Sequence, residues 1–207
     1  MARRTRFAQL ECRLRMSPSL PQLVMRRPHL RRLPQAAIAP GYQVRDFRNG
    51  DETSWNQVLA AAFERDLSEF DFDRMMRRDP AFLPQRVQVV VTSDEVVVAT
   101  ASSWVTERAG VDHSVLHWVG THPEHVGLRL GYEVSLAALQ QAQSERRAAV
   151  WLLTDDHRVA AIKTYLRLGF VPVLTDESHA ARWREALDGI GANSPHLALL
   201  DGPLESY

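Results

Sequence analysis

The segment from His117 to Tyr132 constrains the fold more than any other part of the sequence. An apolar run ends at Thr121, a loop that carries Gly127 and Gly131 follows, and a helical pattern begins at once. In this order, the backbone N–H groups of the loop and of the first helical turn point toward one place, which suits a phosphate or pyrophosphate. Two glycines near the start of a helix are common, so this signal alone is weak.

Composition and charge limit the classes of function. The 207 residues carry a formal net charge of +0, which argues against nucleic-acid and membrane partners on overall charge. Cys12 is the only cysteine, so a disulfide framework and a thiolate metal site are excluded, and we predict a reducing, cytoplasmic location. No apolar run approaches the roughly 20 residues that a membrane-spanning helix needs.

The sequence divides into three regions. Residues 1–40 are rich in arginine and proline and lack a sustained period, so we predict a basic, flexible extension. A nucleic-acid-binding arm is one alternative for it. Met25 begins a segment that resembles the natural N-terminus of a protein. An alternative interpretation is therefore that residues 1–24 result from placing the start codon too far upstream. Residues 41–188 read as a domain, and residues 189–207 as a frayed C-terminal tail.

Periodicity within the domain predicts a mixed α/β structure. Hairpin-like strands come first, and then a strand, a loop, a long helix and a buried strand form a right-handed crossover. We predict strands over 42–47, 86–92, 95–105, 115–121, 149–154 and 170–174, and helices over 51–64, 70–78, 130–145, 156–168 and 177–187.

A second segment, from Ala160 to Phe170, ends in Gly-Phe and is preceded by Asp-Asp-His-Arg. Together with the glycine-bearing loop, it resembles the GNAT superfamily of acyl-CoA-dependent acyltransferases. Over residues 42–187 the sequence is most similar to small bacterial acetyltransferases akin to the C-terminal half of mycothiol synthase. This resemblance implies an α/β fold with a mixed, splayed central sheet flanked by helices. It also implies acetyl-CoA as co-substrate and no metal.

In GNAT proteins the matching loop usually reads Arg/Gln-x-x-Gly-x-Gly/Ala, and its N–H groups hold the CoA pyrophosphate. In this sequence Val126 replaces the basic or amide residue, and Arg129 replaces the middle glycine. If Arg129 has a negative φ, the N–H cradle survives and the guanidinium serves as a replacement cation. If φ must be positive, the loop is strained and CoA affinity falls. The loop residues implied as cofactor-binding are Val126, Gly127, Leu128, Arg129, Leu130 and Gly131.

The resemblance implies further cofactor contacts outside this loop. Val119 and Thr121 would offer backbone groups to the pantetheine arm, which adds like an extra strand. Arg158 stands where many relatives carry asparagine, and we predict that it also binds CoA.

Acyl transfer from a thioester to an amine needs a base for the amine and a proton for the departing thiolate. By resemblance, Tyr165, four residues before Gly169, lies beside the CoA sulfur and donates that proton; a half-buried packing tyrosine is the alternative. His117 is the candidate base, because it shares a strand face with Val119 by period-2 alternation and its ordinary pKa is near 6.5. A structural histidine is the alternative here.

These residues predict an acetyl-CoA-dependent N-acetyltransferase that moves an acetyl group to an amine of a small molecule or peptide. The amine attacks directly through a tetrahedral intermediate. The alternative is a degenerate GNAT domain that binds acyl-CoA or a partner without turnover. A homodimer is compatible with the sequence. An acidic cluster lies between the first two predicted helices and consists of Glu64, Asp66, Glu69, Asp71 and Asp73. It would favour a cationic amine as the acceptor; the alternative is an ordinary stretch of solvent-exposed surface.

Overall fold

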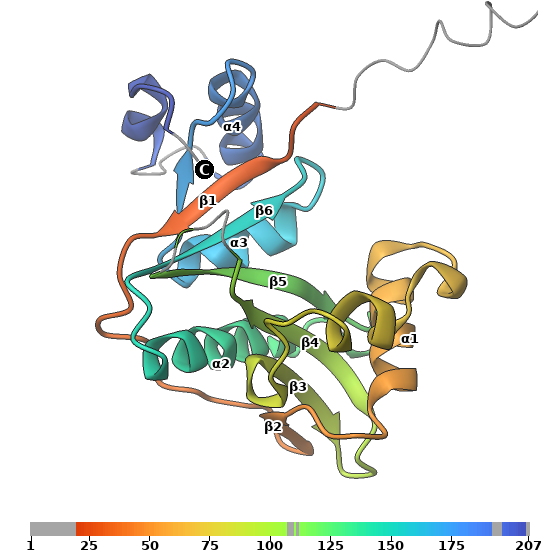
Figure 1. Ribbon diagram of the computed structural model, residues 1–207. Coiled ribbons are helices and arrows are strands. Elements are labelled where there is room, and N and C mark those ends of the chain that lie inside the picture. Colours follow the sequence, from red (N-terminus) through yellow and green to blue (C-terminus); the bar gives the residue numbers. More distant parts are fainter. Residues whose placement is uncertain (1–19, 107–109, 111, 192–195, 206–207) are drawn as a thin grey trace, which may run out of the picture.

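The computed structural model of the chain describes residues 20–106, 110, 112–191 and 196–205 (Figure 1). The strands are β1 (Leu23–Arg27), β2 (Tyr42–Asp46), β3 (Val87–Thr92), β4 (Val97–Trp104), β5 (His113–Thr121), β6 (Ala149–Thr154) and β7 (Val171–Val173). The α-helices are α1 (Glu52–Phe63), α2 (Leu130–Ser144), α3 (Val159–Arg167) and α4 (His179–Asp188). The predicted helix over 70–78 is instead a π-helical turn over Asp73–Arg77.

The described strands form one open sheet in the order β2-β3-β4-β5-β6-β1-β7. Neighbouring strands are antiparallel except for β5 and β6, which are parallel and are joined through α2. This is the strand–helix–strand crossover that the sequence predicts. The predicted mixed α/β sheet flanked by helices is therefore confirmed.

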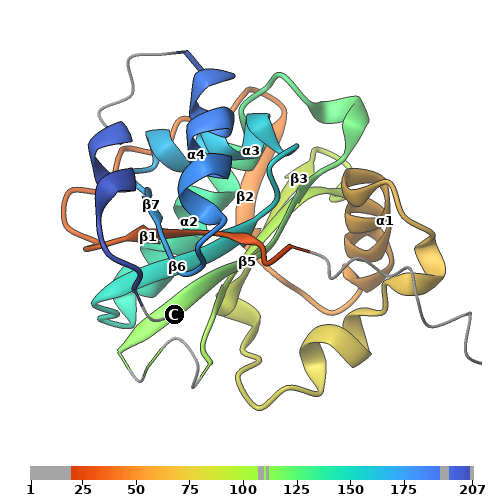
Figure 2. The same cartoon turned by 90° about the horizontal axis from the view of Figure 1, so that it is seen from above.

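The helices cover the two faces of this sheet (Figure 2). On one face, α1 buries Trp55, Val58 and Leu59 against the sheet. On the opposite face, α2 and α3 bury Val134 and Ile162 in the larger core cluster. Burial of these side chains, at roughly 25 cal/mol per Å² of apolar surface, fixes both layers to the strands.

Parallel pairing between β5 and β6 is short. It runs only from His113 opposite Ala149 to Val115 opposite Trp151. After these pairs the two strands separate, so the C-terminal end of β5 has no β6 neighbour. The sheet therefore splays at this point, as the sequence resemblance implied.

A β-bulge in β5 overturns one sequence prediction. Ser102 of β4 pairs with His117, and Thr100 pairs with Gly120, so two residues of β5 stand opposite one residue of β4. Because Thr100 and Ser102 share a face, His117 shares its face with Gly120 and not with Val119. The prediction that His117 and Val119 point to the same side is wrong, because the bulge breaks the alternation.

Strand β1 overturns the prediction that residues 1–40 are wholly an extension. β1 lies between β6 and β7 and pairs antiparallel with both, and Leu23, Val24 and Met25 are buried. Arg26 lies over the ring of Trp151, with 5.0 Å between the guanidinium carbon and the ring centroid. Only three apolar residues mark this strand among prolines and arginines, so its sequence pattern is weak. Residues 1–19 lie outside the described residues.

The C-terminal segment is also more ordered than predicted. Within it, Leu197–Asp201 forms a 3-10 helix, and Leu200 is buried. Glu205 pairs with Arg26 of β1 at 2.7 Å, and its N–H donates to the Leu174 carbonyl. The frayed tail predicted over residues 189–207 is therefore wrong for this part of it.

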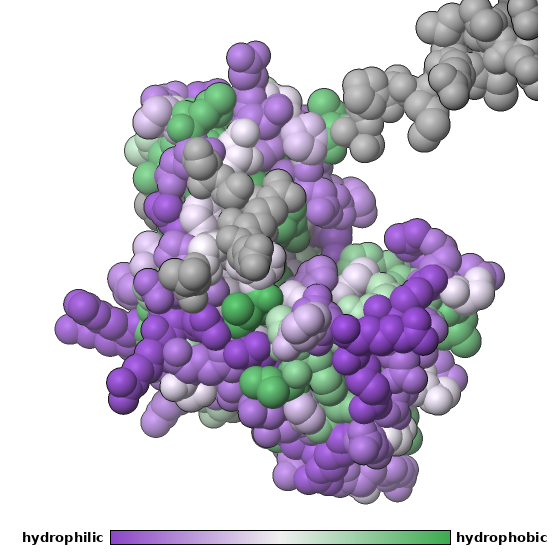
Figure 3. Space-filling view, in the orientation of Figure 1, coloured by the Kyte–Doolittle hydropathy of each residue, from purple (hydrophilic) through white to green (hydrophobic). Residues whose placement is uncertain are grey.

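The surface in the orientation of Figure 1 is mostly hydrophilic, with hydrophobic residues in small separate areas (Figure 3). Such scattered apolar residues are normal on a water-exposed protein surface. None of the helices in the described ranges combines the length and the apolar character that crossing a bilayer requires.

The position of β1 yields a stability prediction. Leu23→Ala should lower the free energy of unfolding by about 3 kcal/mol, because Leu23 is fully buried and its truncation leaves a cavity. Leu20→Ala, at a side chain that is 63% exposed, should change it by less than about 0.5 kcal/mol. Chemical denaturation of both variants measures the difference. Equal, small effects would mean that this segment is an extension after all.

Candidate functional site

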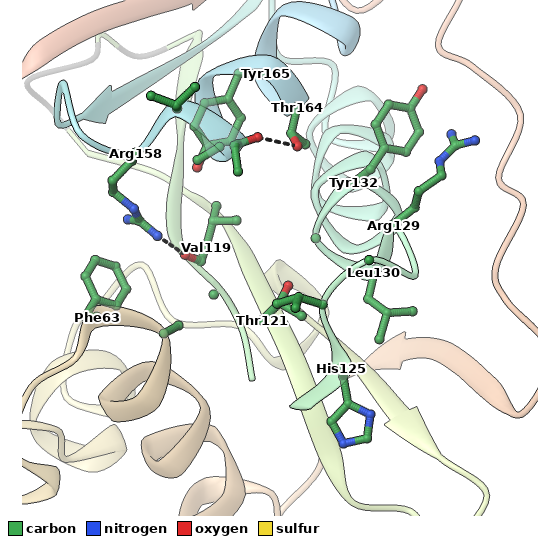
Figure 4. A pocket seen from close by; sticks show the side chains of 18 of the residues that line it. Phe63, Val119, Thr121, His125, Arg129, Leu130, Tyr132, Arg158, Thr164 and Tyr165 are labelled. Carbon is green, nitrogen blue, oxygen red and sulfur yellow. Dashed lines mark hydrogen bonds between the residues drawn. The ribbon is translucent and has the colours of Figure 1, made fainter. Parts of the chain in front are cut away.

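A cavity with a volume of about 540 Å³ opens where β5 and β6 separate (Figure 4). Its walls come from the end of α1, the end of β5, the loop before α2, the β6–α3 loop and α3. The residues predicted as cofactor-binding that line it are Val119, Thr121, Val126, Gly127, Arg129, Leu130, Gly131 and Arg158. The structure therefore brings together residues that lie up to forty positions apart in the sequence. Of the residues predicted to bind the cofactor, only Leu128 does not line this cavity.

The loop before α2 presents a row of backbone N–H groups. Among the described residues, none accepts a hydrogen bond from the N–H groups of residues 127–131. On either side, the N–H groups of Val126 and Tyr132 donate to the carbonyls of Pro123 and Arg129. A run of unpaired N–H groups at the N-terminus of a helix attracts an anion through both its donors and the helix dipole. This loop can hold a phosphate group.

The backbone of Arg129 settles which of the two sequence alternatives applies. Its φ is 61° and its ψ is 14°, which is the positive-φ alternative, the one for which the sequence predicted strain and weaker CoA binding. A side chain in this left-handed region costs about 1 to 2 kcal/mol. The guanidinium lies over the Tyr132 ring at 4.7 Å and 3.8 Å from Glu133, along α2. The loop is locally strained, but its N–H groups remain free.

Gly131 allows α2 to approach β5 closely. A Cβ atom at this position would lie 3.0 Å from the Thr121 hydroxyl oxygen. A larger residue would therefore require the Thr121 side chain or the start of α2 to shift by a few tenths of an ångström. Val126, at the other end of the loop, is 66% exposed and offers no charge to an anion.

Arg158 lies on the α1 side of the cavity. Its Nη2 donates to the Val119 carbonyl at 3.3 Å, and its guanidinium lies over the Phe63 ring at 4.3 Å. Figure 4 shows Arg158 on one side of Val119 and the start of α2 on the other. These contacts place the guanidinium at the splay and not among the N–H groups of the loop.

Tyr165 lines the cavity from α3 and is 4% exposed. Burial raises the pKa of its phenol to about 12, and the nearby charge of Arg158 acts in the opposite direction. The phenol is therefore protonated at neutral pH, as a proton donor must be.

His117 is not among the residues that line the cavity. Burial lowers the pKa of its imidazole to about 4, and the charge of Asp79 opposes this only in part. Its ring packs at 4.7 Å from the ring of Trp118. The position of His117, on the other face of β5 from Val119 and outside the lining of the cavity, supports the structural alternative.

Most of the acidic cluster is engaged locally. Glu64 at the end of α1 lines the cavity. Of the other members, Asp66 accepts from Ser68, and Asp71 accepts from the N–H of Arg74. The remaining two form ion pairs within their own segment: Glu69 with Arg65, and Asp73 with Arg77.

Several cavity residues were not foreseen from the sequence. They come from α1, α2, α3 and the β6–α3 loop: Phe63, Tyr132, His157, Thr164 and Arg167. The spacing of three to four residues from Arg158 to Tyr165 carried the signal for α3. No sequence pattern links Phe63 to this site. Helix α1 packs on the face of the sheet opposite to α2 and α3, and only this packing brings its C-terminal end to the cavity.

Three residues beside the loop lie close enough to share a metal ion. One ligand atom from each of His122, Glu124 and His125 lies within 4.8 Å of the others. The Nδ1 of His125 hydrogen-bonds the Tyr42 hydroxyl at 2.9 Å, and the Nδ1 of His122 accepts from the Glu124 N–H. Both rings are therefore engaged in hydrogen bonds at Nδ1.

Comparisons with known proteins agree with this geometry. The family model of the acetyltransferase (GNAT) family matches residues 51–170. The sequence is 32% identical over 146 residues to a mycothiol acetyltransferase of Pseudarthrobacter chlorophenolicus, covering 67% of this chain and 45% of the relative. It is 28% identical over 151 residues to that of Paenarthrobacter aurescens, covering 70% and 47%. The chain thus spans about half the length of these relatives.

Solved structures show the same fold. A GCN5-related N-acetyltransferase from Sphaerobacter thermophilus superposes with a TM-score of 0.56 at 20% identity, over 73% of this chain and 49% of the other. One from Kribbella flavida gives a TM-score of 0.50 at 24% identity, over 73% and 54%. The chain belongs to the acetyltransferase (GNAT) family, as the sequence resemblance indicated.

The loop geometry predicts how two substitutions affect binding of acetyl-CoA. Gly131→Glu should weaken it about a hundredfold or more, because it adds bulk against Thr121 and a negative charge at the start of α2. Arg129→Gly should keep the affinity within about threefold, because the backbone N–H groups do the binding and glycine accepts a positive φ. Isothermal titration calorimetry measures both.

The control is Gly189→Glu, which adds the same side chain after α4, where a Cβ meets no atom closer than 3.6 Å. Unchanged binding by Gly131→Glu would contradict the assignment of the loop. A tenfold loss in Arg129→Gly would mean that the guanidinium itself is a ligand.

Proposed function

We propose that this protein is an acetyl-CoA-dependent N-acetyltransferase whose acceptor is the amine of a small molecule or peptide. The observation that carries the proposal is the row of unpaired N–H groups over residues 127–131 at the start of α2. That row suits the pyrophosphate of coenzyme A. The cavity continues from it along β5 to Tyr165, so a long donor with a phosphate at one end has room.

Two groups of residues would contact the acetyl-CoA molecule beyond its pyrophosphate. Thr121 and Val119 expose the end of β5 to the cavity, where a pantetheine arm can add as an extended strand. Tyr165 lies farther into the same cavity on α3, at the place where the thioester would end. No metal is needed for this chemistry.

The proposed reaction is a direct transfer. The amine nitrogen forms a bond to the thioester carbon while the carbonyl π electrons move to oxygen, which gives a tetrahedral intermediate. Collapse restores the carbonyl and breaks the carbon–sulfur bond. The sulfur takes a proton from the Tyr165 phenol, and the amine nitrogen loses one. Solvent returns a proton to the phenol, so charges and atoms balance.

The amine proton leaves to water in the cavity in this proposal. We do not assign it to His117, because His117 is not among the residues that line this cavity and burial lowers its pKa to about 4. An acceptor amine that is already neutral therefore reacts, and the rate should rise with pH until the acceptor has lost its proton. The acceptor remains a general amine, since the acidic residues near the cavity are mostly paired.

A second candidate is binding of acyl-CoA without turnover. The exposed Val126 and the strained Arg129 favour it, because each departs from the usual loop. Binding with no acetyl transfer to any amine would support this candidate. Transfer that depends on Tyr165 would exclude it.

The role of Tyr165 gives a kinetic prediction. Tyr165→Phe should lower kcat about a hundredfold, because the departing thiolate loses its proton donor, while the affinity for acetyl-CoA stays within about threefold. Release of free thiol in the presence of a panel of amines measures kcat, and calorimetry measures binding. Tyr132→Phe removes a phenol from the same cavity at the start of α2 and is the matched control. Equal kcat for wild type and Tyr165→Phe would refute this role.

A further inference from the structure

Arg158 is a cationic side chain that the structure anchors at the splay itself. The Val119 carbonyl accepts from one of its N–H groups at 3.3 Å, and the face of Phe63 lies 4.3 Å from its guanidinium carbon. One contact comes from β5 and the other from α1, so a strand of the sheet and a helix packed on one of its faces both hold this group. A stacked guanidinium loses little further freedom when it binds an anion.

The guanidinium retains donors for a ligand. A guanidinium has five N–H donors, and among the described residues only one acceptor, the Val119 carbonyl, is bonded to it. Arg158 lines the cavity and is half-buried, and its remaining N–H groups have no other acceptor among the described residues. Its charge is only partly screened by solvent there.

Acyl transfer creates negative charge at two atoms near this point. The thioester oxygen becomes an oxyanion, and the sulfur departs as a thiolate. A thiolate of ordinary pKa near 8.5 takes a proton only with difficulty from a buried phenol. A fixed positive charge near the reacting atoms lowers the energy of each anion, the oxyanion, the thiolate and the phenolate, relative to the neutral thioester and phenol. The carbon–sulfur bond therefore breaks more readily.

We propose that Arg158 is an electrostatic residue of the acyl-transfer step, and not a phosphate ligand: anchored by Phe63 and the Val119 carbonyl, it stabilises the negative charge on the reacting thioester and on the Tyr165 phenolate. The inference rests on the proposed function and assigns a role within the same site.

The charge of Arg158 already acts on Tyr165 in the free protein. Burial raises the pKa of this phenol to about 12, and Arg158 is the group whose charge lowers it. The other ionisable residues around the cavity come from each element that faces it: Glu64 of α1, Arg129 and Tyr132 at the start of α2, Asp155 and His157 before α3, and Arg167 of α3.

The first test measures the phenol without any turnover. A fluorinated tyrosine at position 165 ionises at a lower pH, within the range where the protein stays folded, and its ¹⁹F resonance reports the ionisation. Arg158→Gln should raise the pKa of this phenol by about one pH unit. Arg158→Lys, which keeps the charge, should restore most of the difference. Arg184→Gln removes the same charge from an exposed position on α4, outside the cavity, and should leave the pKa unchanged.

The second test separates catalysis from binding. Arg158→Gln should lower kcat about ten- to a hundredfold while KM for acetyl-CoA changes less than about threefold, and Arg158→Lys should recover part of kcat. A rise in KM with kcat unchanged would overturn the proposal and make Arg158 a cofactor ligand. An unchanged phenol pKa in Arg158→Gln would also overturn it.

The two tests distinguish this inference from the proposed function. If no amine is acetylated, the proposed function fails, but the ¹⁹F titration still decides whether Arg158 acts on Tyr165. If acetylation occurs and the titration shows no effect, only the role of Arg158 fails. Circular dichroism of each variant shows whether the fold is intact, and Arg158→Lys provides the comparison if Arg158→Gln unfolds.

Discussion

The separation of β5 from β6 after Val115 and Trp151 is the constraint on which the site depends. Parallel strands that stop pairing leave one strand end without a neighbour, and a polar backbone needs partners. In this structure a cavity lies beside the unpaired end of β5. The start of α2 closes one side, and Arg158, bonded to the Val119 carbonyl, closes the other.

Reliance on backbone donors explains how the loop tolerates an unusual sequence. Val126 supplies no charge, and Arg129 replaces a glycine, yet the N–H groups of residues 127–131 remain unpaired in the described chain. The cost is local, about 1 to 2 kcal/mol for the positive φ of Arg129. Gly131 is different, because a side chain there would meet the Thr121 hydroxyl, where the end of β5 and the start of α2 are in close contact. The residue type at Gly131, where the helix and the strand are in close contact, is therefore more constrained than the residue types at Val126 and Arg129.

Local patterns predicted the elements that carry the site, and long-range packing decided the rest. The period of α2 and the apolar run of β6 were sufficient to predict both elements and their crossover. β1 was missed because Leu23 to Met25 is a very short apolar run, and its stability comes from β6 and β7 on either side. His117 was misplaced because one extra residue in β5 reverses the alternation, and no local signal marks that bulge.

Coenzyme A binding at the loop is the central claim, and amide NMR tests it most directly. In a ¹H–¹⁵N spectrum of protein labelled at glycine and leucine, coenzyme A should shift the N–H resonances of Gly127, Leu128, Leu130 and Gly131 more than those of Gly189 or Leu23. Phosphate oxygens that accept from these donors cause that change. Shifts confined to other residues, or none at millimolar coenzyme A, would contradict the assignment of this loop as the donor site.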